Sequence, residues 1–295
     1  MQSVTAARCQ CIAPLPLQLS IILEEVANYE KGGGRKFSEF YEKWMVQLED
    51  ILHQLLKAIN SNKHHQNGNQ SSEISTTSTE DNVDEQLESL VSKVTTHQKQ
   101  YYAAKWAAAH EDVLAFYAPS WLSPLEIAYS WSWVTGWKPS MAFRVLDSLR
   151  KRAGTEWPEG DNEKTRKMGE LRVKIRLEEE KVERQMERQQ VAMVDWRMVE
   201  LVRLASRRCE DAEDNKRIEE MVEVALRGLK NGLEKVMKAA DCVRLKTLKG
   251  VLDILTPKSK QCVEFLAAAL LLQIQLRKWG CGKDQIQTST VNGST

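Results

Sequence analysis

Residues 121–152 read WLSPLEIAYSWSWVTGWKPSMAFRVLDSLRKR, and the rest of the chain is organised around this stretch. It holds four of the nine tryptophans of the protein, at Trp121, Trp131, Trp133 and Trp137. Because indole rings carry a large apolar area, one short segment supplies much of what a hydrophobic core needs. We therefore expect these tryptophans to form a packed core without chemistry of its own.

The same stretch carries the signals of a helix, a turn and a second helix. Ser123 can accept hydrogen bonds from free backbone N–H groups, Pro124 fits the first helical position, and Glu126 closes a capping box. Gly136 tolerates a left-handed helix end, and Pro139 cannot continue the hydrogen-bond ladder of a preceding helix.

Elsewhere, apolar residues recur every three or four positions, as in residues 37–59, 83–117 and 218–255. No stretch alternates apolar and polar residues for long enough to predict a strand. We therefore predict an all-α fold, a multi-helix bundle with long antiparallel helices.

Residues 168–193 leave two arrangements open. Met168, Ile175 and Val182 are seven apart, as in a coiled coil, but the residue seven after Leu171 is Glu178. This imperfect repeat favours a long antiparallel bundle helix over a dimeric coiled coil. Its interleaved Lys, Arg and Glu residues are typical of an exposed helix, which makes it a candidate interaction surface through Lys174, Lys181 and Arg188.

Composition divides the chain into one domain and three loose segments. Residues 1–35 end in a glycine-rich linker and are expected to form a disordered extension. A single helical domain should span residues 36–280 and contain a polar, disordered loop at 60–82. Residues 281–295 are expected to be a disordered tail.

Charge and cysteine content narrow the class of protein. Lys and Arg total 42 against 41 for Asp and Glu, so no net field draws the whole chain to nucleic acid or membrane. Six scattered cysteines form no CxxC pair, which argues against a zinc site or a disulfide scaffold and indicates a reducing compartment. No signal peptide is expected, and the apolar run at 265–272 is far shorter than the roughly 20 residues of a membrane span.

Catalytic signatures are also missing from the sequence. It contains no GxSxG, HExxH, phosphate-loop or dinucleotide-binding motif. The adjacent His64 and His65 lack a third ligand nearby, and His97 and His110 lack a neighbouring nucleophile. We predict that the protein is not an enzyme and has no metal site.

Several motifs together resemble the DELAY OF GERMINATION domain of land plants, also found at the C-terminus of TGA-type bZIP transcription factors. The resemblance spans about residues 37–280. The motifs, in the family's order, are Phe40-Tyr41-x-x-Trp44, Tyr101-Tyr102, Ser120-Trp121-x-Ser123-Pro124-Leu125-Glu126, Trp133-x-x-Gly136-Trp137-x-Pro139-Ser140, Ala239-Ala240-Asp241-x-x-Arg244-x-x-Thr247-Leu248 and Ile254-Leu255-Thr256-Pro257.

This resemblance implies an all-helical plant regulatory protein of the nucleus and cytoplasm that binds other proteins, such as signalling phosphatases or transcription factors. Homo-oligomerisation stays open. The residues expected to form the structural core of the motifs are Trp44, Trp121, Pro124, Trp133, Gly136, Trp137 and Pro139.

Two departures limit what the resemblance carries over. The residues before Phe37 are neither basic nor heptad-patterned, so we expect no basic helix of the kind that TGA factors insert into DNA, and any DNA contact is expected to be indirect. The dormancy regulator of the family resembles a haem binder through two histidines of its last helix. Gln273 and Arg277 stand at those positions here, and neither supplies an imidazole to iron, so no cofactor is expected.

The leading hypothesis is a non-enzymatic regulator that acts through protein–protein interaction in abscisic-acid, dormancy or stress signalling and in the regulation of transcription. One alternative is a sequence-specific DNA-binding transcription factor related to TGA factors. Another is a protein of pollen aperture formation.

Overall fold

The computed structural model describes residues 33–68, 77–130, 133–153, 162–206 and 212–291. All regular elements within these ranges are helices, which confirms the predicted all-α class. The helices are α2 (Gly33–Gly68), α3 (Thr77–Glu111), α4 (Leu114–Tyr117), α5 (Pro124–Ser130), α6 (Met141–Ala153), α7 (Asn162–Met193), α8 (Trp196–Ala205), α9 (Ala212–Leu255) and α10 (Lys260–Val291).

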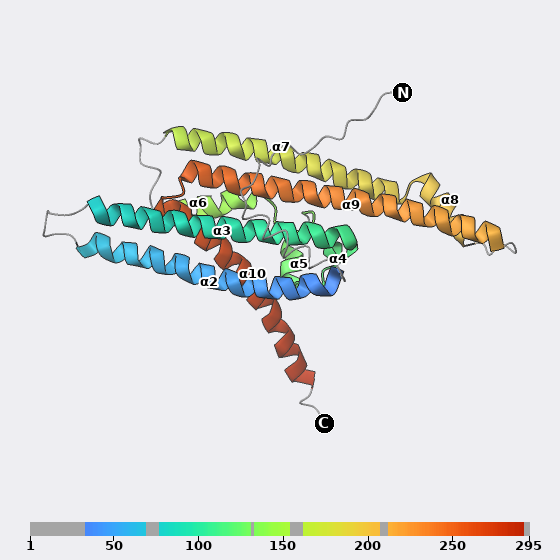
Figure 1. Cartoon of the computed structure of the whole chain (residues 1–295), viewed down its shortest axis with the longest axis horizontal. Coiled ribbons are helices and arrows are strands. Elements are labelled where there is room, and N and C mark those ends of the chain that lie inside the picture. The colour runs from blue at the N-terminus through green and yellow to red at the C-terminus, as the bar shows by residue number, and fades with distance from the viewer. Residues whose placement is uncertain (1–32, 69–76, 131–132, 154–161, 207–211, 292–295) are drawn as a thin grey trace.

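Two pairs of long helices form the body (Figure 1). One pair is α2 with α3, the other is α7 with α9, and α3 joins the pairs by packing on α9. Helix α10 packs across α2, α3, α5 and α6, while the short α8 lies against α9. Both short helices of the motif segment, α5 and α6, therefore pack against α10.

The predicted apolar stripes are the ones that become buried. On α2 the stripe includes Phe37, Trp44, Leu48 and Leu55, each no more than 2 % exposed. Because these positions are four or seven residues apart, about one or two helical turns, they form one face of the helix, which packs against α3.

Helices α7 and α9 run in opposite directions, as close contacts at both ends show. Leu171 lies against Gly250, and Gln189 lies against Gly232. Between these contacts Glu178 forms an ion pair with Lys246, at 3.7 Å. This pairing within one chain places the seven-residue repeat of α7 in a bundle.

Helices extend further than composition predicted. The expected loop at 60–82 is wrong at both ends, because α2 continues to Gly68 and α3 begins at Thr77. The expected tail is wrong up to Val291, where α10 ends. Polar residues other than Gly and Pro disfavour a helix by only a few tenths of a kcal/mol each, so a helix started by packing can propagate beyond its apolar face.

Of the expected N-terminal extension, residues 33–35 belong to α2, and the expectation for residues 1–32 lies outside the described part of the chain. The same holds for residues 69–76 of the predicted loop and 292–295 of the predicted tail. Across the described ranges, no helix is long and apolar enough to cross a membrane.

Candidate functional site

The capping box forms as predicted at the start of α5. The backbone N–H of Ser123 donates to a Glu126 carboxylate oxygen at 2.9 Å, and the N–H of Glu126 donates to Ser123 Oγ at 3.4 Å. Glu126 is itself buried and also accepts from Tyr41 Oη at 3.0 Å. One carboxylate thus fixes a helix start and joins α5 to α2.

A buried ionic cluster, Lys105, Asp241 and Arg244, lies beneath the turn between α5 and α6. Each of the three is no more than 1 % exposed. Asp241 accepts from Lys105 Nζ at 2.8 Å and from an Arg244 guanidinium N–H at 2.5 Å, and its second oxygen accepts from Trp106 Nε1 at 3.0 Å. The carboxylate therefore holds α3 and α9 together.

The two cations also hold the backbone of the turn. Arg244 donates to the carbonyls of Trp137 at 2.8 Å and Val134 at 3.1 Å, and Lys105 donates to the carbonyl of Thr135 at 3.1 Å. These carbonyls offset part of the second buried positive charge. The motif segment is thus anchored to two helices at once.

Glycine is required at position 136 because the turn passes directly over Arg244. A Cβ atom there would lie 2.8 Å from the guanidinium carbon, closer than such atoms approach. The preceding Thr135 has a φ of 49°, in the left-handed region that non-glycine residues rarely adopt. The surrounding contacts impose a conformation that the turn would not adopt alone.

The predicted motif residues occupy different environments. Trp44, Trp121 and Trp133 are buried at 2 %, 8 % and 2 % exposure, and Pro139 is buried as well. Trp137 and Gly136 are half-buried. Pro124 is exposed at the first position of α5, so the prediction that it belongs to the core is wrong and its contribution is to the helix start.

Carboxylates of α7 complete the far side of the turn. Glu179, 3 % exposed, accepts from the backbone N–H of Ser140 at 2.6 Å, one residue before α6 begins. Burial raises the pKa of this carboxyl above its ordinary value. Glu183 accepts from Trp133 Nε1 at 3.3 Å and from Lys138 Nζ at 2.8 Å. Helix α7 therefore contacts the motif turn directly through these two carboxylates.

Arg277 of α10 joins this helix to α2 and to the segment before α5. Its guanidinium pairs with Glu42 of α2, donates to the Trp121 carbonyl at 3.4 Å and lies 5.1 Å from the centre of the Tyr41 ring. Gln273, one turn earlier on the same helix, is half-buried.

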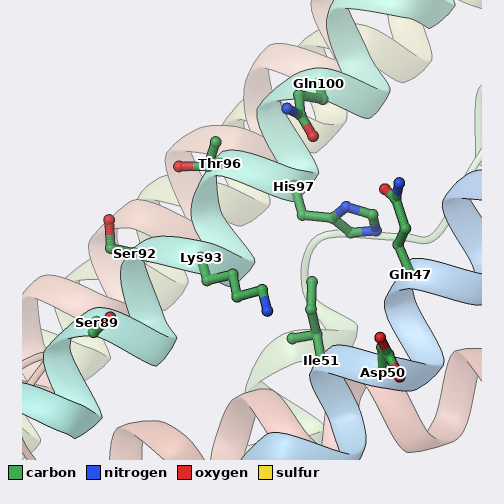
Figure 2. A pocket seen from close by; sticks show the side chains of 9 residues that line it. All are labelled: Gln47, Asp50, Ile51, Ser89, Ser92, Lys93, Thr96, His97 and Gln100. Carbon is green, nitrogen blue, oxygen red and sulfur yellow. The ribbon is translucent and has the colours of Figure 1, made fainter. Parts of the chain in front are cut away.

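A pocket of about 580 Å³ lies between α2 and α3 (Figure 2). Helix α3 contributes Ser89, Ser92, Lys93, Thr96, His97 and Gln100, and α2 contributes Gln47, Asp50 and Ile51. Lys93 Nζ donates to Gln54 Oε1 at 2.9 Å, so this cation already serves to join the two helices.

His97 forms a reciprocal pair with Trp44 at the pocket wall. The indole N–H donates to the His97 carbonyl at 3.1 Å, and the imidazole Nε2–H donates to the Trp44 carbonyl at 3.1 Å. The rings stack with centroids 4.8 Å apart and planes within 1°. Burial, helped by the nearby Lys93 and opposed by the hydrogen bond to the Trp44 carbonyl, lowers the pKa of His97 from 6.5 to about 4. This histidine is a packing residue.

Acidification should therefore destabilise the protein through His97. The unfolded chain takes up a proton near pH 6.5, whereas the folded chain resists it until about pH 4, so stability falls as pH drops through that window. Between pH 7 and pH 5 the loss should be about 2 kcal/mol. Urea unfolding at both pH values should show this loss in wild type and not in His97→Gln. The control His110→Gln, at an exposed position, should keep the wild-type loss, and equal losses in wild type and His97→Gln would contradict the assignment.

No group of three potential metal ligands comes together in the described part of the chain. His110 is exposed and lies 3.4 Å from a carboxylate oxygen of Glu234. His64 and His65 lie where side chains are outside the description.

The three predicted surface residues Lys174, Lys181 and Arg188 are all exposed on α7. Because they are seven residues apart, they fall along one side of the helix. They do not join the motif turn, which contacts another side of α7 through Glu179 and Glu183.

Sequence reasoning missed Lys105 and Glu179 as parts of this centre. Lys105 sits between Tyr102 and Trp106, in an apolar run where a charge needs a partner, and that context was the available signal. Glu179 belongs to a run of three glutamates that resembles solvated helix surface, so nothing local separates it from its neighbours.

Comparison with known proteins agrees with the motifs. The DOG1 family, described as seed dormancy control, matches residues 51–148. The chain is 54% identical to Protein DOG1-like 4 of Arabidopsis thaliana over 245 residues, 83% of this chain and 92% of that protein. It is 30% identical to Protein ZW2 over 206 residues (65% and 80%) and 28% identical to Protein RESPONSE TO ABA AND SALT 1 over 253 residues (82% and 94%), both of the same plant. The resemblance seen in the motifs is thereby confirmed, and the chain belongs to the DOG1 family of seed dormancy control.

Proposed function

We propose that the protein is a non-enzymatic regulator that acts by binding other proteins in dormancy, abscisic-acid or stress signalling. The observation that carries the proposal is that the buried ionisable side chains bond to other parts of the fold. The buried ionisable groups Lys105, Asp241, Arg244, Glu126 and Glu179 each bond to partners that hold helices or turns together. A catalytic centre would instead direct such groups at a substrate-sized space.

The relatives support the pathway. One similar protein is named for its response to abscisic acid and salt, and the family is described by seed dormancy control. We extend this role to the present chain, with partners among signalling phosphatases or transcription factors and a location in nucleus and cytoplasm.

Partner recovery tests the proposal. Tagged protein purified from seed and from salt-stressed tissue should retain phosphatases or transcription factors, and at least one should bind the pure protein in a two-component measurement. Failure of every purified candidate to bind, together with turnover of a metabolite by the pure protein, would overturn the proposal.

Haem should not bind through α10. Arg277 is engaged by Glu42 and Tyr41, and neither it nor Gln273 offers an imidazole. We expect haem titration to give no Soret shift that depends on these residues. The idea fails if a stoichiometric shift appears in wild type and disappears in Gln273→Ala/Arg277→Ala, while the exposed-site control Lys278→Ala keeps it.

A further inference from the structure

The two long sides of α7 differ in how their charges are balanced. Toward α6 and the motif turn, Arg172 pairs with Asp147 at 2.9 Å, and Glu183 pairs with Lys138 at 2.8 Å. On the opposite side, Glu178 is shared by two lysines, Lys181 at 3.3 Å and Lys246 of α9 at 3.7 Å. On that second side, the lysines therefore outnumber the carboxylates that could neutralise them.

The register between the helices shows which cations meet there. Since Gly250 lies against Leu171 and α9 runs antiparallel, Lys246 and Lys249 flank Lys174. At the other end Gly232 lies against Gln189, which places Lys235 near Arg188. We call this row the basic seam, and its members are Lys174, Lys181, Arg188, Lys235, Lys246 and Lys249.

This arrangement works against folding. Flanking positions of paired helices are usually filled by opposite charges, and like charges facing each other are destabilising. All six cations are exposed, and Lys174, Lys235 and Lys249 have no acidic partner within the described residues. Helix α7 carries glutamates that would balance them if placed one position earlier or later, so the sequence has the means to neutralise the seam and does not.

We propose that the basic seam is the docking surface for an acidic segment of a partner protein, an inference that rests on the proposed function. From Lys174 to Arg188 the seam spans 14 residues of α7, about 21 Å at 1.5 Å per residue. A partner helix with carboxylates every two turns matches that length and charge. Such contacts raise the association rate and set orientation.

Protein is favoured over nucleic acid by the surroundings of the seam. Glu180 and Glu187 lie on the outward face of α7, and Asp253 follows Lys249 by one turn. Duplex DNA would bring phosphates onto those carboxylates, whereas a single helix fits within the row. The net charge of +1 also supplies no broad positive field.

A synthetic acidic helix tests the seam. The probe is a fluorescein-labelled alanine-based peptide of about 21 residues with glutamates at every second turn, matched to the seam length. Its binding to the full chain is followed by anisotropy at low salt. The triple variant Lys174→Glu/Lys246→Glu/Lys249→Glu should weaken binding at least about tenfold, because attraction becomes repulsion. The control Lys43→Glu/Lys57→Glu/Arg176→Glu makes the same net charge change at exposed positions off the seam and should stay within about twofold of wild type.

Thermal unfolding of the seam variant shows whether a loss of peptide binding comes from a loss of the folded structure. The seam variant should melt close to the wild-type temperature, since the Glu178–Lys246 pair that it loses is exposed and its new glutamates only replace one set of neighbouring like charges by another. Equal peptide binding by both triple variants, no peptide binding by wild type, or tighter binding of a 20-base-pair duplex than of the peptide would each overturn the seam.

Binding of a purified natural partner to wild type and to the seam variant distinguishes failure of this inference from failure of the proposed function. A purified partner that binds wild type and the seam variant equally would overturn the seam while the proposed function stands. Peptide binding that is lost in the seam variant, in a protein for which no partner can be purified, would support the seam and count against the proposed function.

Discussion

Asp241→Asn should destabilise the fold by about 3–5 kcal/mol, because it removes the one carboxylate that Lys105 and Arg244 share and leaves two buried cations. The asparagine keeps the size of the side chain, so the loss reports charge and not volume. Urea unfolding at pH 7 measures it. The control Asp253→Asn changes an exposed acid of the same helix and should alter stability by well under about 1 kcal/mol.

The destabilised variant should recover in part as pH rises. Burial lowers the pKa of Lys105 from 10.5 to about 8 in the wild-type fold, so between those values the unfolded chain holds a proton that the folded chain has lost. Stability therefore increases with pH in that window. Without Asp241 the charged lysine is less favourable still, so the increase should begin below pH 8. Arg244 stays charged throughout, and full recovery is not expected. A loss below about 1 kcal/mol at pH 7 would show that the cluster is solvated.

Features that depend on neighbouring residues were predictable. The capping box at Ser123 and Glu126 and the apolar stripe through Trp44 follow from spacing alone, since a helix places residues three and four apart on one face. The exposure of Lys174 followed from the same rule applied to charges.

Features that depend on distant residues were not. Lys105 and Asp241 are 136 positions apart, and each fits a helix pattern as an ordinary surface charge. Their pairing is decided by how α3 packs on α9, which no local pattern encodes. The helix end near Pro257 shows the same limit at short range. Thr256 takes a φ of 71° and its N–H donates to the Leu252 carbonyl, so it closes α9 and the proline follows as a stop. The last helix begins only at Lys260, three residues after Pro257, so this proline does not stand at its first position.

If the proposed basic seam is correct, helix α7 serves two purposes. Its Glu179 and Glu183 organise the motif turn, whereas its Lys174 and Lys181 face solvent beside α9. Changes to the first pair should therefore alter stability, and changes to the second should alter partner binding. This division makes it meaningful to compare the tryptophans of the turn with the seam in one set of measurements.

Trp133→Ala should destabilise the protein by about 3–5 kcal/mol, the usual loss when a buried tryptophan is truncated. The indole is 2 % exposed, lies 4.9 Å below the Arg244 guanidinium and donates to Glu183 at 3.3 Å. Truncation leaves a cavity and also uncovers the cluster that holds the turn. This loss is a large fraction of the roughly 5–15 kcal/mol that stabilises a domain. We therefore expect reduced helicity by circular dichroism and a lower unfolding midpoint.

Two further variants show which property of Trp133 matters. One tests the lost indole N–H against the lost volume, and the other tests the loss of an exposed indole. Trp133→Phe keeps an aromatic face for Arg244 and loses only the N–H donor and part of the ring, so its destabilisation should be smaller than that of Trp133→Ala. Trp279→Ala removes an indole that is 60 % exposed and should leave the midpoint nearly unchanged. If Trp133→Ala instead unfolded like wild type yet no longer bound a purified partner, Trp133 would belong to a binding surface, because a core tryptophan cannot be removed without a measurable loss of stability.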